Sequence, residues 1–303
     1  MKIADTLVIL TVSNPYLNKG VYSFMIIDFH THIFSPEVIK RREFFIKKDL
    51  AFSNLYGTEN AKMIAAPDLI QEMDLSGIDV SVVMGIGWSD YQLAHDMNDY
   101  ISDSVLKYPD RLVGFGSINP CWGELAVYEM ERCQSIGLKG LGELHPHLQN
   151  FRLDNYKIML PIVETVQKLD WIITTHSSEP VGHLYNGKGD TYPQQLAKFI
   201  EMFQEVKIIL AHWGGGLPFY ALMPEIMTIL NNVYFDIAAS PFLYSKSILP
   251  VVVKLVGAHK ILLASDFPLL RMKKLLQLVQ NSDILDQEKK EICGENAAKL
   301  LGI

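Results

Sequence analysis

Cysteine is scarce in this 303-residue chain, which contains only Cys121, Cys133 and Cys293 and no Cys-x-x-Cys pair. An odd number at wide spacing argues against a disulfide framework and against a thiolate zinc site. The same scarcity is typical of a reducing compartment, so we predict a cytoplasmic protein. The sequence also lacks any apolar run of the roughly 18 residues that a membrane-spanning helix requires. We therefore expect no membrane partner.

The chain has no excess of positive charge either. It carries 27 Lys and Arg residues against 34 Asp and Glu residues, a net charge of −7 with neutral histidines. Nucleic-acid binding depends on basic contacts to phosphates, so we expect no nucleic-acid partner. Hydrophobic residues make up 49% of the sequence, and no segment is of low complexity. This composition predicts a folded protein with a large core, and the length suits one α/β barrel.

Residues 1–24 precede the first convincing structural pattern. They contain a short apolar run, TLVILTV at 6–12, behind a single Lys2. The run lacks the length and the small-residue cleavage site of a secretory signal peptide. We expect residues 1–24 to be an N-terminal extension or an added strand, with Met25 as an alternative start. We expect residues 25–303 to form a single catalytic domain.

Apolar runs typical of strands alternate with amphipathic helical patterns from Met25 onward. Nearly continuous apolar runs indicate parallel strands that are buried on both faces and connected by helices. Eight such runs, together with the chain length, favour a closed (β/α)8 TIM barrel over a doubly wound sheet. The predicted strands are 26–30, 79–84, 111–116, 138–143, 171–175, 207–211, 232–237 and 260–264. The predicted helices are 67–77, 90–107, 123–136, 156–169, 193–205, 217–230, 244–256, 268–280 and 286–301.

One long insertion, residues 34–66, follows the first predicted strand. Loops of this length in a compact domain are usually functional or disordered, and here the loop would cover the barrel mouth. Its basic stretch, KRREFFIKK at 40–48, could place Arg41 or Arg42 over the mouth to bind a substrate carboxylate. The alternative is a solvated helix face.

Side chains able to bind a metal end five of the predicted strands. In IIDFHTHIF (26–34), His30 and His32 alternate and therefore share one face of a strand. The carboxyl ends of barrel strands meet at one end of the fold, where catalysis takes place, so we expect all these side chains to converge. The others are Glu143 and His145 after the fourth strand, His176 after the fifth, His212 after the sixth and Asp266 after the eighth.

Imidazole and carboxylate donors suit zinc, iron, manganese or nickel, whereas the small number of carboxylates argues against calcium. Such a metal lowers the pKa of its bound water to about 7 and polarises an oxygen of the substrate. Asp266 could bind the metal and accept a proton from that water. His212, if it is not a ligand, could act as an acid or base.

Seven segments resemble the amidohydrolase superfamily, in particular its amidohydrolase-related branch, which includes aminocarboxymuconate-semialdehyde decarboxylase. The resemblance extends in order over nearly the whole chain from Met25. It implies that His30, His32, His176 and Asp266 hold a divalent metal, usually zinc, and that His212 positions or activates metal-bound water. The segments are IIDFHTHIF (26–34), GLKGLGELHPH (137–147), TTHSSEP (174–180), ILAHWGGGLPF (209–219), NVYFDIAAS (232–240), ILLASDFP (261–268) and GENAAKLLGI (294–303).

Glu143 is a departure from many members of that branch. It is similar to a strand-four glutamate of TatD-like and phosphotriesterase-like relatives, which bridges two metals. The chain could therefore hold one or two metal ions, with Glu143 as a ligand, or Glu143 could orient a ligand histidine. His145 and His147 follow, but Pro146 breaks the strand geometry. Either histidine could contact substrate or lie in a loop.

The sequence predicts a metal-dependent enzyme acting on a small organic molecule, with zinc as the first choice of metal. Our first expectation is hydrolysis of an amide, ester or lactone by metal-activated water, and Glu143 as a true ligand would favour it. The alternative is non-oxidative decarboxylation of an aromatic or unsaturated carboxylic acid. That reaction would be favoured by a cationic clamp at the mouth, supplied by Arg41, Arg42 or Arg271.

Four further interpretations remain open. Trp213 could line a substrate pocket or cover the barrel rim. Phosphoester hydrolysis and a non-catalytic binding role rank below the two reactions above. A homodimer is compatible with the sequence.

Overall fold

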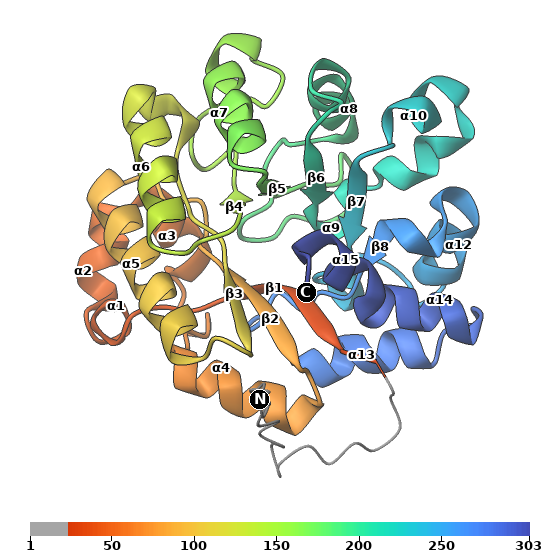
Figure 1. Ribbon diagram of the computed structural model, residues 1–303, viewed down its shortest axis with the longest axis horizontal. Coiled ribbons are helices and arrows are strands. Elements are labelled where there is room, and N and C mark those ends of the chain that lie inside the picture. The colour runs from red at the N-terminus through yellow and green to blue at the C-terminus, as the bar shows by residue number, and fades with distance from the viewer. Residues whose placement is uncertain (1–23) are drawn as a thin grey trace, which may run out of the picture.

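Eight short parallel strands surround the centre of the molecule, and helices form a ring outside them (Figure 1). The computed structural model describes residues 24–303, so the predictions for residues 1–24 lie almost wholly outside the described residues. The predicted (β/α)8 barrel is confirmed. Its strands are β1 (Ile27–His32), β2 (Val80–Met84), β3 (Leu112–Gly114), β4 (Leu141–Leu144), β5 (Ile172–Thr175), β6 (Lys207–Leu210), β7 (Val233–Asp236) and β8 (Ile261–Leu262).

Backbone contacts close the barrel at two seams. The strands pair in parallel as β1-β2-β3 and as β4-β5-β6-β7-β8. At one seam an isolated parallel β-bridge pairs Gly116 with Leu141, and at the other a second one pairs Thr31 with Phe267. The amide of Phe29 also donates to the carbonyl of Leu263 at 2.8 Å. The carboxyl ends of all eight strands consequently lie at the same end of the barrel.

Alternating strand residues pack into two different apolar clusters, which explains the continuous apolar runs. On β2, Val82 belongs to a cluster made almost entirely of strand residues, whereas Val83 packs with the apolar faces of the helices. On β6, Ile209 belongs to the first cluster and Ile208 to the second. Both faces of each strand are therefore buried, as parallel barrel strands require. Ala297 of the last helix also packs into the first cluster.

The helices follow the predicted periodicity closely, and none of those in residues 24–303 is long and apolar enough to cross a membrane. The main outer helices are α4 (Ala66–Ser76), α5 (Tyr91–Lys107), α6 (Glu124–Ser135), α7 (Tyr156–Lys168), α8 (Pro193–Met202), α10 (Pro224–Ile229), α12 (Ile248–Val256) and α13 (Met272–Gln280). Shorter ones are α9 (Ala211–Gly214), α11 (Ser240–Leu243), α14 (Asp286–Lys290) and α15 (Asn296–Leu301).

Four predicted helices differ in detail from the structure. The helices predicted at 244–256 and 268–280 begin only at Ile248 and Met272. The helix predicted at 217–230 divides into a 3₁₀ turn at Leu217–Leu222 and the short α10. The helix predicted at 286–301 contains a π-helical turn at Glu291–Glu295. A side chain at Gly294 in this turn would collide with the carbonyl oxygen of Met25, so the glycine allows the segment before β1 to pack there.

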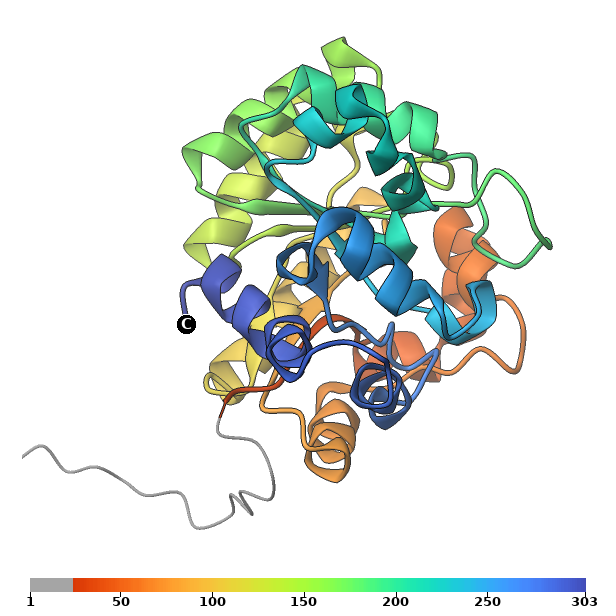
Figure 2. The ribbon, with the colours of Figure 1, turned by 90° about the vertical axis from the view of Figure 1, so that its right-hand side faces the viewer.

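The insertion at 34–66 is folded rather than a plain loop, because it contains three short helices. These are α1 (Pro36–Lys40), α2 (Arg42–Lys48) and α3 (Leu50–Tyr56). Asp49 caps α3 through the amide of Phe52 at 2.8 Å and also accepts from the amides of Ser89 and Asp90. In Figure 2 these helices and the segment after β5 project from the same side of the molecule.

Candidate metal centre

Six of the predicted site residues lie together at the carboxyl ends of the strands. They form two groups of three, and within each group the ligand atoms all lie within 4.8 Å of one another. Five of the side chains are buried, and Asp266 is partly buried. We call these residues the donor cluster. Its two groups are His30, His32 and Asp266, and Glu143, His176 and His212.

Glu143 lies between the two groups of the donor cluster. Its Oε2 is 3.5 Å from His30 Nε2 and 3.8 Å from His32 Nε2. Its Oε1 is 3.2 Å from His176 Nδ1 and 3.6 Å from His212 Nε2. The carboxylate can therefore contribute to one metal ion or connect two.

The imidazoles of β1 are oriented by acceptors on their far sides. His30 Nδ1 lies 2.8 Å from Asp236 Oδ2, and His32 Nδ1 lies 3.1 Å from the carbonyl oxygen of Met84. If each Nδ1 carries the proton, both Nε2 atoms present lone pairs, and they face each other at 3.0 Å. Two lone pairs this close repel each other, and a cation between them would remove the repulsion. A carboxylate behind a ligand histidine, as Asp236 is here, is typical of metal sites. Asp266 Oδ1 lies 3.2 Å from His32 Nε2, on the same side.

His176 adds a second feature that fits a metal. Its Nε2 is buried and has no hydrogen-bond partner among the described residues. Its ring stacks on that of His145, with centroids 4.0 Å apart. Burial holds the pKa of His145 well below its usual range, and the charge of His176 lowers it further. A buried nitrogen without a partner is rare in folded proteins, so its presence here points to a missing ligand.

Two members of the donor cluster have unusual backbone conformations. His212 and Asp266 have φ angles of 55° and 58°, in the left-handed region that few non-glycine residues adopt. The amide of His212 donates to Asp236 Oδ1 at 2.8 Å, which holds the turn after β6. Asp236 therefore orients both the ring of His30 and the backbone of His212. Our sequence analysis missed Asp236, although a lone acid at the end of an apolar strand was a usable signal.

Burial and mutual charge determine the pKa values within the donor cluster. Burial opposes the charged form of His212, but hydrogen bonding to Glu143 and the charge of Asp266 raise its pKa to about 9. Burial likewise opposes ionisation of Glu143, yet His30 and the histidine hydrogen bonds hold its pKa well below its usual range. The pKa of Asp266 is lowered, against burial, by its hydrogen bond with His32 and by the charge of His30.

The insertion adds a tyrosine that the sequence analysis did not identify. Burial raises the pKa of Tyr56 well above its usual value, and the charges of Asp266 and Glu143 raise it further. The guanidinium of Arg42 donates to the backbone carbonyls of Tyr56, Thr58 and Ala61, so it holds this part of the insertion in place.

The side chains of the other predicted site residues find their partners outside the donor cluster. Trp213 is fully buried, and its Nε1 donates to Ser240 Oγ at 2.6 Å. Arg41 bonds Glu37 at 2.8 Å and lies over the ring of Phe44. Within residues 24–303, no hydrogen bond or ion pair joins Trp213 or Arg41 to the cluster, and their substrate-binding roles stay predictions. His147 is half-exposed and faces Asp190 at 3.2 Å.

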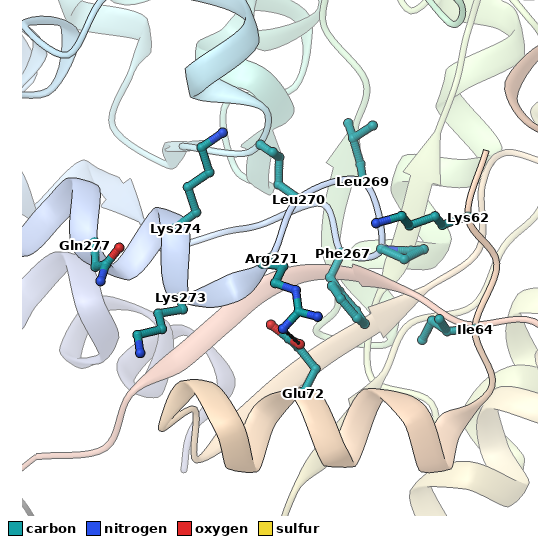
Figure 3. Close-up of a pocket in the computed structure, with 11 residues that line it drawn as sticks. Lys62, Ile64, Glu72, Phe267, Leu269, Leu270, Arg271, Lys273, Lys274 and Gln277 are labelled. Atoms are coloured by element: carbon teal, nitrogen blue, oxygen red, sulfur yellow. Dashed lines mark ion pairs between the residues drawn. The ribbon is translucent and has the colours of Figure 1, made fainter. Parts of the chain in front are cut away.

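A cavity of about 620 Å³ lies beside the loop that follows Asp266, and Figure 3 shows its lining. Arg271 points there towards Glu72, with 3.4 Å between NH1 and Oε2. Lys273 and Lys274 extend in different directions from α13 (Figure 3). These cations do not converge on one point, and Arg271 is paired away from the donor cluster.

The barrel and the donor cluster define a metal-dependent TIM-barrel enzyme. More narrowly, the chain belongs to the amidohydrolase family, because residues 27–303 match the sequence model of that family. Two curated relatives are similar over most of the chain. One is 2-amino-3-carboxymuconate-6-semialdehyde decarboxylase of Dictyostelium discoideum, 24% identical over 284 residues, covering 78% of this chain and 77% of the relative. The other is gamma-resorcylate decarboxylase of Polaromonas sp. (strain JS666 / ATCC BAA-500), 25% identical over 253 residues, covering 69% and 76%.

Solved structures share the fold at low sequence identity. The 5-carboxyvanillate decarboxylase of Sphingomonas paucimobilis superposes with a TM-score of 0.75 at 18% identity, covering 93% of this chain and all of that one. The dihydroxybenzoic acid decarboxylase of Polaromonas sp. JS666, with bound manganese and 2-nitroresorcinol, gives a TM-score of 0.70 at 21% identity, covering 92% and 97%. The nitrogen and oxygen donors of the cluster in this chain fit a divalent metal, but they do not select the predicted zinc.

Our first expectation, hydrolysis of an amide, ester or lactone, was wrong. Both curated relatives are decarboxylases, which favours the alternative. The physical reason for the error is that imidazole and carboxylate ligands serve both reactions. A Lewis-acidic metal stabilises negative charge on oxygen in either case, so the strand-end motifs do not distinguish them.

Proposed function

We propose that this chain is a metal-dependent, non-oxidative decarboxylase of a small aromatic or unsaturated carboxylic acid. The observation that carries the proposal is that both curated relatives, each aligned over more than two thirds of this chain, are decarboxylases. The geometry of the donor cluster independently supports the metal dependence, because two facing imidazole nitrogens and an unpartnered His176 nitrogen fit a cation. We also retain the predictions of a cytoplasmic location and a homodimer.

In this proposal His30, His32, His176 and Asp266 hold the metal, and Glu143 is a further ligand or connects two ions. Nitrogen and oxygen donors of this kind accept manganese or zinc. When bound, the divalent cation would polarise the oxygens of the substrate and stabilise the negative charge left by the departing CO2. Asp236 and the carbonyl of Met84 orient the two β1 histidines towards it.

The protein groups must also supply a proton. Decarboxylation breaks the bond between the carboxylate group and the ring or alkene carbon that bears it. The electron pair stays on that carbon, and a proton then takes the place of CO2 there. His212 is the proposed donor, through Nε2, because its backbone is fixed by Asp236 and its ring faces the cluster. The insertion, with Tyr56, would limit the access of water to the reacting carbon.

The test is CO2 release from a panel of hydroxybenzoates, aminobenzoates and unsaturated dicarboxylates by manganese-loaded protein. We expect release from at least one acid, loss of release on chelation, and no cleavage of matched amides, esters or lactones. Cleavage of those compounds without any CO2 release would overturn the proposal. Elemental analysis of the purified protein would report the metal and its stoichiometry in the same preparation.

A further inference from the structure

Asp28 is a buried acid that the proposed chemistry leaves unused. It lies on β1, two residues before His30, and is 1% exposed. Its Oδ1 accepts hydrogen bonds from two backbone amides, that of His30 at 3.2 Å and that of Ser265 at 3.0 Å. Burying a carboxylate costs stability unless such bonds offset the cost, so an apolar residue is the usual choice at a buried strand position.

The amide of His30 bonds Asp28 at a point where the pairing of β1 with β2 shifts by one residue. Asp28 pairs with Ser81 of β2. Thr31, three residues later, pairs with Val83, which is only two residues after Ser81. The strand β1 therefore contains one extra residue, a β-bulge, and an extra residue of this kind has no partner in the ladder. Asp28 supplies the acceptor that the ladder does not.

The bulge turns both histidines of β1 towards the centre of the barrel. Before it, Ile27 and Phe29 pack in the apolar cluster made almost entirely of strand residues. Strict alternation would place Ile33 on that same side, and His30 with His32 on the other. Instead Ile33 packs with the helices, and the two histidines point to the other members of the donor cluster. The conformation that Asp28 stabilises therefore orients two of the proposed metal ligands.

The same carboxylate oxygen holds the backbone after β8. That strand contains only Ile261–Leu262, so it ends well before Asp266. Beyond it, the amide of Ser265 donates to Asp28. The next amide, that of Asp266, donates to the carbonyl of His30 at 2.9 Å. One oxygen of Asp28 thus joins the backbone of His30 to the residue before Asp266, across the seam between β1 and β8.

We infer that Asp28 is a positioning residue for the candidate metal centre. Its carboxylate fixes the bulge of β1 against the chain that follows β8, and so sets the spacing of His30, His32 and Asp266. The inference rests on the metal centre of the proposed function. Asp28 acts through backbone amides, so it does not have to touch the metal or the substrate. A side chain with an acceptor oxygen at the same place should replace it, whereas a side chain without one should not.

The test measures the manganese affinity of the purified protein by competition with a chelator of known affinity. Asp28→Ala removes the acceptor and should weaken manganese binding by about ten-fold or more, the usual effect of losing a group that orients metal ligands. Asp28→Asn keeps an oxygen at the place of Oδ1 and should bind manganese within about three-fold of the wild type. Rescue by this variant is the result that a requirement for an acceptor predicts.

Two further variants control for lost stability. Glu129→Ala also removes a buried acceptor, but between α5 and α6, and should lower the melting temperature without changing manganese affinity. Asp28→Val lacks the acceptor but fills the space with a side chain suited to a strand. It should lose the same affinity as Asp28→Ala, and it keeps the inference testable if the alanine variant folds poorly.

The outcomes separate this inference from the proposed function. Wild-type affinity in Asp28→Ala or Asp28→Val, with only a lower melting temperature, would show that Asp28 is structural and would overturn the inference alone. An equal loss of affinity in Asp28→Asn would also overturn it, because the site would then need the charge rather than the acceptor. Weaker binding in Asp28→Ala, without CO2 release from any acid by the wild type, would overturn the decarboxylase proposal alone. Failure of the wild type to bind manganese or zinc would overturn both.

Discussion

Two buried polar clusters of this molecule differ in how completely their hydrogen bonds are satisfied. Between α5 and α6, the side chain of Glu129 accepts from Asn98 Nδ2 at 2.8 Å and from two nitrogens of Arg132 at 2.7 and 2.8 Å. Asn98 also accepts from the amide of Ser117 at 2.8 Å. Each side-chain nitrogen of Asn98 and Arg132 meets an acceptor. In the donor cluster, two imidazole nitrogens face each other and one nitrogen of His176 has no partner.

The difference indicates what each cluster is for. A fully paired buried network stabilises one packing of its helices, whereas a partly paired one costs stability unless a ligand completes it. The protein therefore retains an unfavourable arrangement at the strand ends where a cation would make it favourable. Each prediction below changes one cluster and uses the other as its reference.

Removing the metal should have the largest effect, because it leaves the donor cluster incomplete. We expect chelation to reduce CO2 release to background and manganese to restore it. Metal that binds only the folded state also raises its stability, by about 2.7 kcal/mol at a free concentration of 100 times Kd. Differential scanning calorimetry with and without manganese measures this change. An unchanged melting temperature at saturating manganese would mean that the cluster holds no such ion.

Replacing the proposed proton donor should have the next largest effect. His212→Asn should lower kcat by about 10²–10⁴-fold, the usual contribution of a general acid, while the metal content stays constant. The turn after β6 should persist, because the backbone amide at this position still bonds Asp236. His147→Asn is the matched control, since His147 is half-exposed and outside the cluster. Equal loss of activity in both variants would argue against a catalytic role for His212.

Breaking the satisfied cluster should affect stability but not metal binding. Glu129→Ala leaves Arg132 and Asn98 without their acceptor, which should cost about 3 kcal/mol and lower the melting temperature by roughly 6–12 °C. Manganese affinity should not change. Glu131→Ala, on the same helix, removes only an exposed pair with Lys168 and should cost less than about 0.5 kcal/mol. Similar melting temperatures for the two variants would contradict the contrast between the clusters.

The convergence of the donor cluster was predictable because strand ends in a barrel share one edge. His30, His32, His176 and Asp266 each end or follow an apolar run, and that position alone brings them together. The folded insertion was not predictable in the same way. Its helices are five to seven residues long, too short for periodicity, and depend on tertiary contacts such as the Asp49 cap and the packing of Phe52 against Trp88.

The expected roles of the arginines show a second limit of sequence reasoning. The basic stretch at 40–48 could have supplied a clamp for a carboxylate or a solvated helix face, and Arg271 was a further candidate for the clamp. In the structure Arg42 binds backbone carbonyls and Arg271 pairs with Glu72. Sequence distinguishes the charge of a side chain, not the partner that neutralises it. Asp236 was missed for a different reason, since the acid that ends β7 was not considered together with the side chains that end the other strands.

The smallest predicted effect concerns Asp236, which orients the donor cluster without belonging to it. Asp236→Asn keeps the shape of the side chain but removes the charge behind His30 Nδ1, so manganese affinity should fall by about 10–100-fold. Competition with a chelator of known affinity measures the change, and activity should recover at high manganese. Asp170→Asn, at an exposed acid, should leave the affinity unchanged. If Asp236→Asn instead lowers activity equally at all manganese concentrations, Asp236 acts on the position of His212 rather than on the metal.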